Sequence, residues 1–191
     1  MRMQILRSLG LGAAIAVMLA GGPGTRETDA APVKVTQRVS CSSNQRTATA
    51  LALALPQVAF SQGAQVTNGV LTFTAADETC SAQGWAVTVQ LAQIEYAGNG
   101  HATTIPAANV VLGTPEGLDL VAGQPIIQAG GPWLGTGGSL QQPRKVAYAN
   151  AGFGMGEYQF TAPVMMTLPP RTTAGTYSAL LTVTMSAGPG G

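Results

Sequence analysis

The sequence predicts an all-β fold, a two-sheet β-sandwich, because two stretches alternate apolar and polar side chains with a period of two. That period is what a strand with one buried and one solvated face requires. In the C-terminal stretch, the face expected to be buried carries Tyr177, Ala179, Leu181, Val183 and Met185. In the upstream stretch it carries Trp85, Val87, Val89 and Leu91. The chain shows no convincing helical period after its N-terminal leader.

The N-terminus has the composition of an export signal. Arg2 and Arg7 precede an apolar run, 9–20, that is too short to cross a bilayer comfortably. We predict a signal peptide and spacer over residues 1–31, with cleavage between 20 and 31, and a single domain over residues 32–191. Neither a lipidation site nor a second apolar span nor a C-terminal anchor is expected. The predicted location is therefore extracellular.

Composition argues against partners that need a strong electrostatic field. Charged residues make up 9% of the chain, and the part from Pro32 onward carries six basic and six acidic residues. Binding to a phosphate backbone depends on several Lys or Arg contacts, so nucleic acid is an unexpected partner. Solubility then depends on Thr, Ser, Gln, Asn and Gly, as in secreted β-proteins and extracellular filaments.

The two cysteines, Cys41 and Cys80, predict one disulfide in an exported chain. Each follows or ends a predicted strand, so the bond would clamp neighbouring strands or sheets. A reactive or metal-binding pair is the alternative.

The remaining strands follow from alternation between turn signals. Asn68-Gly69 is interpreted as a turn, and 113–138, rich in Gly and Pro, as a long loop. Strands are predicted at 33–40, 47–55, 70–75, 85–91 with an extension to 96, 105–112, 145–150, 157–162, 164–168 and 175–185. About nine strands at such short spacing are typical of an immunoglobulin-like or jelly-roll-like sandwich.

Residue types that carry catalysis or bind metals are sparse, so we predict no enzyme, no metal site and no cofactor. His101 is the only histidine, and no Gly-x-Ser-x-Gly motif is present. Asp77 with Glu78, or Glu116 with Asp119, would form a glycosidase pair only at the right separation, and turn chemistry is the simpler role.

Two glycine-rich segments have alternative interpretations. Gly152-Phe-Gly-Met-Gly156 lacks the spacing and the helix of a phosphate loop, so we expect a close backbone approach or bulge there. Trp133, within 130–138, would either stack on a sugar ring or cap one end of the core.

The order of these features resembles the WxL domain of bacterial cell-surface proteins. The resemblance is carried by Gly84-Trp85-Ala86-Val87-Thr88-Val89, by Ile105-Pro106, and by a terminal block in which Tyr177 and Leu181 have the Tyr-x-x-x-Leu spacing. Where the family pattern has Trp-x-Leu, this chain has Val183 and Met185 at its end and Trp85 with Val87 upstream. The cysteines are not part of that pattern.

The resemblance implies a non-catalytic module that binds peptidoglycan or a wall polysaccharide without a covalent bond. The alternative is a structural subunit that assembles into a filament or surface layer of identical subunits, with segment 33–40 added as a strand to the sheet edge of the next subunit.

Overall fold

A computed structural model describes residues 45–51, 53–98 and 103–188, all within one compact unit, Val39–Gly191. The all-β prediction is confirmed, since the only helix in this part of the chain is a short 3-10 turn, η1, at Ala107–Asn109. The strands are β1 Arg46–Ala50, β2 Gln65–Asp77, β3 Trp85–Leu91, β4 Ile94–Tyr96, β5 Thr104–Ile105, β6 Val110–Leu112, β7 Glu116–Gly123, β8 Trp133–Leu134, β9 Gly138–Ser139, β10 Arg144–Ala149, β11 Gly156–Leu168, β12 Tyr177–Ser178 and β13 Leu181–Ala187. The predicted signal peptide, strand 33–40, Cys41 and His101 lie outside the described residues.

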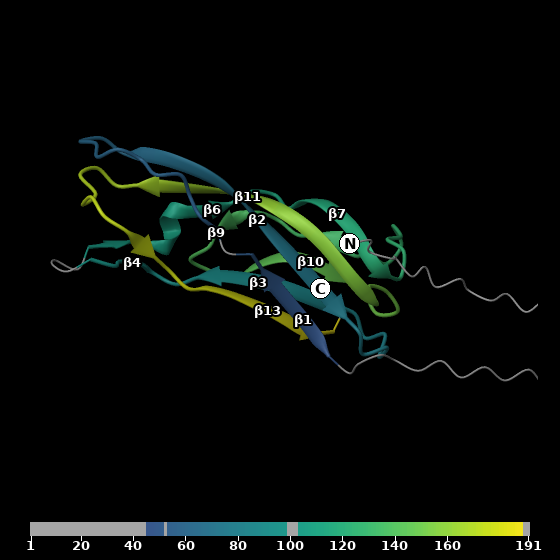
Figure 1. The fold of residues 1–191 in the computed structure, drawn as a ribbon. Coiled ribbons are helices and arrows are strands. Elements are labelled where there is room, and N and C mark those ends of the chain that lie inside the picture. The colour runs from purple at the N-terminus through teal and green to yellow at the C-terminus, as the bar shows by residue number, and fades with distance from the viewer. Residues whose placement is uncertain (1–44, 52, 99–102, 189–191) are drawn as a thin grey trace, which may run out of the picture. The chain divides into compact units, whose positions relative to one another are not determined.

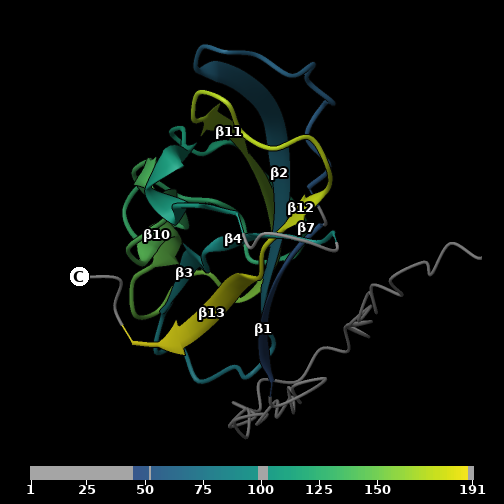
Figure 2. The same ribbon diagram turned by 90° about the vertical axis from the view of Figure 1, so that its left-hand side faces the viewer.

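The strands form three antiparallel sheets. The large sheet has the order β1-β2-β11-β6-β9, and β7 also pairs with β11. The second sheet has the order β13-β3-β10-β8, and a small sheet joins β12, β4 and β5. The long strands β2 and β11 run side by side in one layer, while β3, β10 and β13 form the facing layer (Figures 1 and 2).

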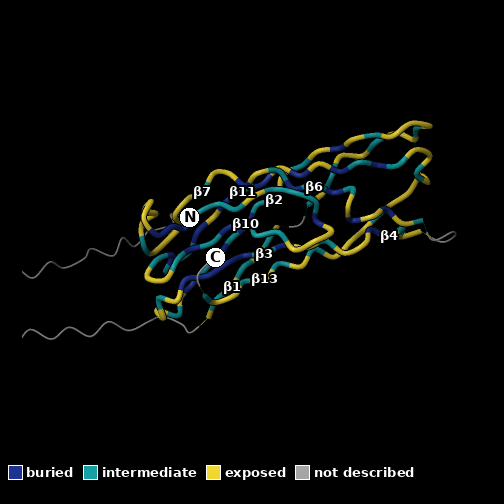
Figure 3. The backbone as a smooth tube through the Cα atoms, turned by 180° about the vertical axis from the view of Figure 1, so that it is seen from behind, coloured by how far each residue is buried: buried dark blue, intermediate teal, exposed yellow. Residues whose placement is uncertain are grey.

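The core lies between the large and second sheets and consists of alternate side chains from both. Phe73 of β2 stacks on Phe160 of β11, with ring centroids 5.1 Å apart. From β3, Trp85, Val87 and Val89 are at most 1% exposed. The burial pattern alternates along β2 and β11 as well (Figure 3). The predicted strand phase of Trp85 and Val87 is therefore confirmed.

The Asn68-Gly69 turn prediction is wrong, because both residues lie inside the continuous strand β2. An added Cβ on Gly69 would come within 2.8 Å of Leu53 Cδ1 and 2.9 Å of Leu55 Cδ2. The missing side chain at Gly69 thus leaves room for the Leu53 and Leu55 side chains beside the strand, and the glycine does not mark a turn.

The two strands predicted at 157–162 and 164–168 are one strand, β11, that continues through Pro163. Gly113 N donates to Pro163 O at 2.7 Å, so the backbone of Pro163 faces that neighbour and not β2. The edge of β11 opposite β2 pairs with β6 from Met166 to Val164 and with β7 from Thr161 to Gly156. The proline, which has no N–H to donate, therefore lies where one ladder gives way to the next.

The segment 113–138 is not a structureless loop. It contains β7, β8 and the start of β9. Strands β7 and β9 belong to the large sheet, and β8 belongs to the second sheet. Thirteen strands are present in the described part of the chain, against about nine predicted. The difference arises largely from two-residue strands, which show no alternation.

Both ends of the domain differ from the predicted strands. The strand predicted at 47–55 ends as β1 at Ala50, and the C-terminal block is divided into β12 and β13. Ala179, which lies between them, is exposed, whereas Leu181, Val183 and Met185 are partly buried against the core. The prediction for Ala179 is therefore wrong.

The predicted disulfide leads to a stability test. Cys80 lies between β2 and β3, and pairing with Cys41 stays a prediction. A bridge across about 40 residues would stabilise the fold by roughly 4 kcal/mol, mainly by restricting the unfolded chain. We expect Cys41→Ser to lower the melting temperature under oxidising conditions and to change nothing under reducing conditions. Titration of two reactive thiols in the native secreted protein would show that the bridge is absent.

Candidate functional site

Trp133 lies in a strand and not in a flexible loop. It begins β8 and pairs with Tyr148 of β10, so the two side chains share one face of the second sheet. The next pair, Leu134 and Ala147, faces the core. Trp133 and Tyr148 therefore lie on the outer face, where both remain partly exposed.

The two rings form a cross-strand aromatic pair. Their centroids are 5.3 Å apart and their planes are inclined by 48°. Lys145 Nζ lies 5.3 Å from the centroid of the Tyr148 ring, a cation–π arrangement. Tyr148 thus contacts an aromatic and a cationic neighbour, and both contacts fix the ring beside Trp133.

Glycines before β8 determine where Trp133 can lie. An added Cβ on Gly130 would overlap the Phe153 ring, with Cδ2 at 1.8 Å. Gly131 has a φ of +91°, and its added Cβ would be 3.1 Å from Trp133 Cε3. Asn150 N donates to Gly130 O at 3.0 Å, which ties this turn to the end of β10. These contacts of the turn therefore fix the position at which Trp133 joins the sheet.

The rest of this outer face is small or carries neutral hydrogen-bonding groups. Ala86 lies opposite Tyr148 on one side of β3 and opposite Ser186 on the other. The next row pairs Thr88 with Thr184. The strands β3, β8, β10 and β13, all within the described residues, contain no acidic residue. We call this surface, defined by Trp133, Tyr148, Lys145, Thr88, Thr184 and Ser186, the aromatic face.

The residues that carry the family resemblance divide into two groups. Trp85 and Val87 are fully buried in β3, and Met185 lies opposite Val87 on β13. The others, Tyr177, Leu181 and Val183, line an open pocket. Tyr177 is held there by its hydroxyl, which donates to Thr173 O at 2.9 Å, and by its contact with the Tyr96 ring.

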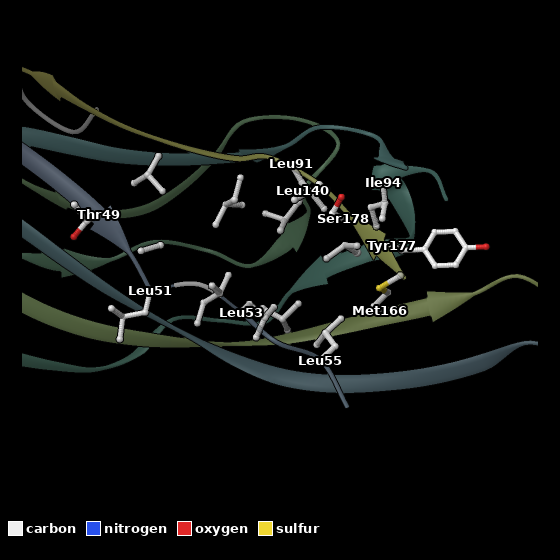
Figure 4. Close-up of a pocket in the computed structure, with 17 residues that line it drawn as sticks. Thr49, Leu51, Leu53, Leu55, Leu91, Ile94, Leu140, Met166, Tyr177 and Ser178 are labelled. Carbon is white, nitrogen blue, oxygen red and sulfur yellow. The ribbon is translucent and has the colours of Figure 1, made fainter. Parts of the chain in front are cut away.

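The pocket is an apolar groove with a volume of about 650 Å³. One wall is the end of β1 with the following residues up to Leu55, and the other is the segment from Tyr177 to Val183. In Figure 4, Leu53 and Leu55 approach from one side, and Leu91 and Leu140 from the opposite side. The sequence pattern singles out Tyr177, Leu181 and Val183 of the second wall but no residue of the first, because neither the proximity of the walls nor the early end of β1 is encoded locally.

The acidic residues considered as a glycosidase pair have other roles or positions. Asp77 is 2% exposed and accepts hydrogen bonds from Thr79 N at 3.0 Å and Thr79 Oγ1 at 2.7 Å, which is the geometry of a turn. Arg46 Nε also donates to the Asp77 carboxylate at 3.2 Å. Glu116 and Asp119 are exposed residues of β7, a strand and not the expected turn.

The close approach predicted for Gly152–Gly156 is confirmed. Trp85 Nε1 donates to Gly154 O at 2.7 Å, and an added Cβ on Gly154 would lie 2.6 Å from the same nitrogen. Nearby, Tyr158 donates its hydroxyl proton to Gln124 O at 2.7 Å. Burial, followed by the Asp77 charge, raises the pKa of Tyr158 to about 12, so this hydroxyl stays protonated at neutral pH. This cluster has a structural role.

In the part of the chain that the structure describes, no group of three or more His, Cys, Asp or Glu side chains is arranged to hold a metal ion. No helix in the same residues is long and apolar enough to cross a membrane.

A comparison of the chain with protein-family models, with curated proteins and with solved structures finds no match, so the resemblance to the WxL domain stays a prediction.

Proposed function

We propose that the mature protein is a non-catalytic module at the cell surface that binds a wall polysaccharide without a covalent bond, through the aromatic face. The observation that carries the proposal is the partly exposed Trp133 ring, whose centroid lies 5.3 Å from that of the Tyr148 ring. The two rings lie on a sheet face whose strands contain no acidic residue. Export and surface location rest on the sequence of the N-terminus.

The chemistry of this face suits an uncharged polymer. The C–H groups of a pyranose ring pack on an aromatic ring, and the large amphipathic indole offers such a surface next to water. Thr88 and Thr184 provide hydroxyl groups that donate to and accept from sugar hydroxyls, and Ser186, whose hydroxyl donates to Ala86 O at 3.4 Å, provides an acceptor.

The test is sedimentation with isolated bacterial sacculi, before and after removal of their attached polysaccharide. We expect wild-type protein to sediment with intact sacculi and Trp133→Ala to lose at least tenfold in affinity. Since Trp133 is only partly buried, this substitution should lower the melting temperature by a few degrees at most.

Phe60→Ala is the matched control, because Phe60 is an exposed aromatic residue, at 58%, outside the aromatic face. It should bind as wild type does. Wild-type protein that stays in the supernatant at every pH and salt concentration would rule the proposal out. Equal losses of affinity for Trp133→Ala and Phe60→Ala would show that Trp133 does not contact the polysaccharide.

A further inference from the structure

The edge strands β1 and β13 meet along a seam that no hydrogen bonds close. β1 ends the large sheet and β13 ends the second sheet, and the two strands lie side by side (Figure 2). No backbone hydrogen bond joins these two strands, whose residues are all described. The sandwich is therefore open along one side.

The register shows which backbone groups of β13 face the seam. Ala92 N donates to Leu180 O, whereas Leu91 N donates to Leu140 O, away from β13. Leu181 lies opposite Leu91, so this is a pair without mutual hydrogen bonds. The N–H and C=O groups of Leu181, and of Val183 two residues later, consequently point to the free edge.

The same reasoning applies to β1. Leu51 N donates to Thr72 O, and Glu78 N donates to Gln45 O, so odd-numbered residues of this strand bond to β2. Ala48 and Ala50 therefore direct their backbone groups toward the seam. Their small side chains leave space beside the strand.

The core is incompletely covered at this place. The inward side chains of β13, Leu181, Val183 and Met185, are only partly buried, as is Leu91 at the end of β3, while the earlier inward side chains of β3 are at most 1% exposed. The apolar groove described above opens from this seam, between residues 49–55 and 177–183. Partly exposed apolar side chains next to edge groups that pair with no other described strand are the features of an acceptor for an added strand.

We propose that the groove receives segment 33–40 of a second copy of the chain as an extended strand. Val33, Val35, Gln37 and Val39 share one face of that segment, and Lys34, Thr36, Arg38 and Ser40 share the other. The valines match the apolar groove, while the cations would stay in water. Eight extended residues span about 26 Å, enough to follow the seven residues from Tyr177 to Val183.

Insertion into a second copy and self-insertion differ in their effect on association. Residues 41–45 separate segment 33–40 from Arg46, where β1 begins. Insertion into the groove of the same chain would require a reversal within these five residues, which is an ordinary length for a hairpin loop, and would leave the protein monomeric. Insertion into a second copy requires no reversal and produces oligomers.

The experiment compares the mature protein with a variant that lacks residues 33–40. Sedimentation velocity should show oligomers of the mature protein that grow with concentration, and only monomers of the shortened variant. A labelled peptide of residues 33–40 should bind the shortened variant, and replacement of its three valines by Asn should weaken binding at least tenfold.

Val183→Pro tests the acceptor edge, since it removes an N–H that faces the seam and none that bonds to β3. It should abolish peptide binding. Trp133→Ala should leave assembly unchanged, which separates this inference from wall binding. Mature protein that stays monomeric at high concentration, or a peptide that binds equally well without its valines, would overturn the inference, whether or not Val183→Pro folds.

Discussion

Trp85→Ala should destabilise the fold by about 3 to 5 kcal/mol. The ring is completely buried, so its removal leaves a large cavity between the sheets. It also removes the hydrogen bond from Nε1 to Gly154 O and the contact with the Tyr158 ring, whose centroid is 6.1 Å away. The buried Gly154 carbonyl would lose its partner, which adds to the cost.

Thermal unfolding measures this effect, and a decrease of about 10 °C or more is expected for a domain of this size. Trp133→Ala serves as the control, because it removes the same side chain from the outer face. An unchanged melting temperature for Trp85→Ala, or equal decreases for both variants, would contradict the burial of Trp85.

Asp77→Ala should have the second largest effect, a loss of roughly 3 kcal/mol in the free energy of unfolding. The carboxylate is buried and accepts hydrogen bonds from Arg46 and from the backbone and hydroxyl of Thr79. Its removal takes away these three hydrogen bonds, and of the donor residues only the side chains of Arg46 and Thr79 keep a partner, Ser81 Oγ. Arg46 is the first residue of β1, which pairs with β2 alone, so β1 should be loosened first.

Urea unfolding gives the free energy, and hydrogen exchange over residues 46–50 reports the loosening of β1. Asp77→Asn, which keeps an acceptor oxygen, should lose less than Asp77→Ala. Asp119→Ala is the control, since Asp119 is exposed on β7, and it should stay within about 0.5 kcal/mol of wild type. If Asp77→Ala behaved like this control, the Asp77–Arg46 pair would have no role in stability.

The parts of the fold that the sequence predicts correctly depend on local period. Alternation placed Trp85, Val87 and Val89 on the inner face of β3, because successive side chains of a strand must point to opposite faces. Gly69 and Pro163 were misinterpreted because their roles depend on distant neighbours, the side chains of 53–55 and the change from β6 to β7.

The difference between local period and long-range contacts also explains why only part of the candidate site could be predicted from the sequence. Trp133 stands out in the sequence as an aromatic residue among glycines. Its pairing with Tyr148 does not, because the register of β8 on β10 cannot be derived from either segment alone. Likewise, the groove joins residues near both ends of the domain. Long-range pairing, which sequence period does not reveal, creates both surfaces.

The most direct test of the central claim, that Trp133 contacts a wall polysaccharide, uses the intrinsic fluorescence of the protein. The chain has two tryptophans, so Trp85→Phe leaves Trp133 as the only reporter. Titration with soluble wall-polysaccharide fragments should shift the Trp133 emission and saturate at the concentration that also releases the protein from sacculi. Emission that stays constant while the fragments still release the protein would contradict the claim, because binding would then occur elsewhere.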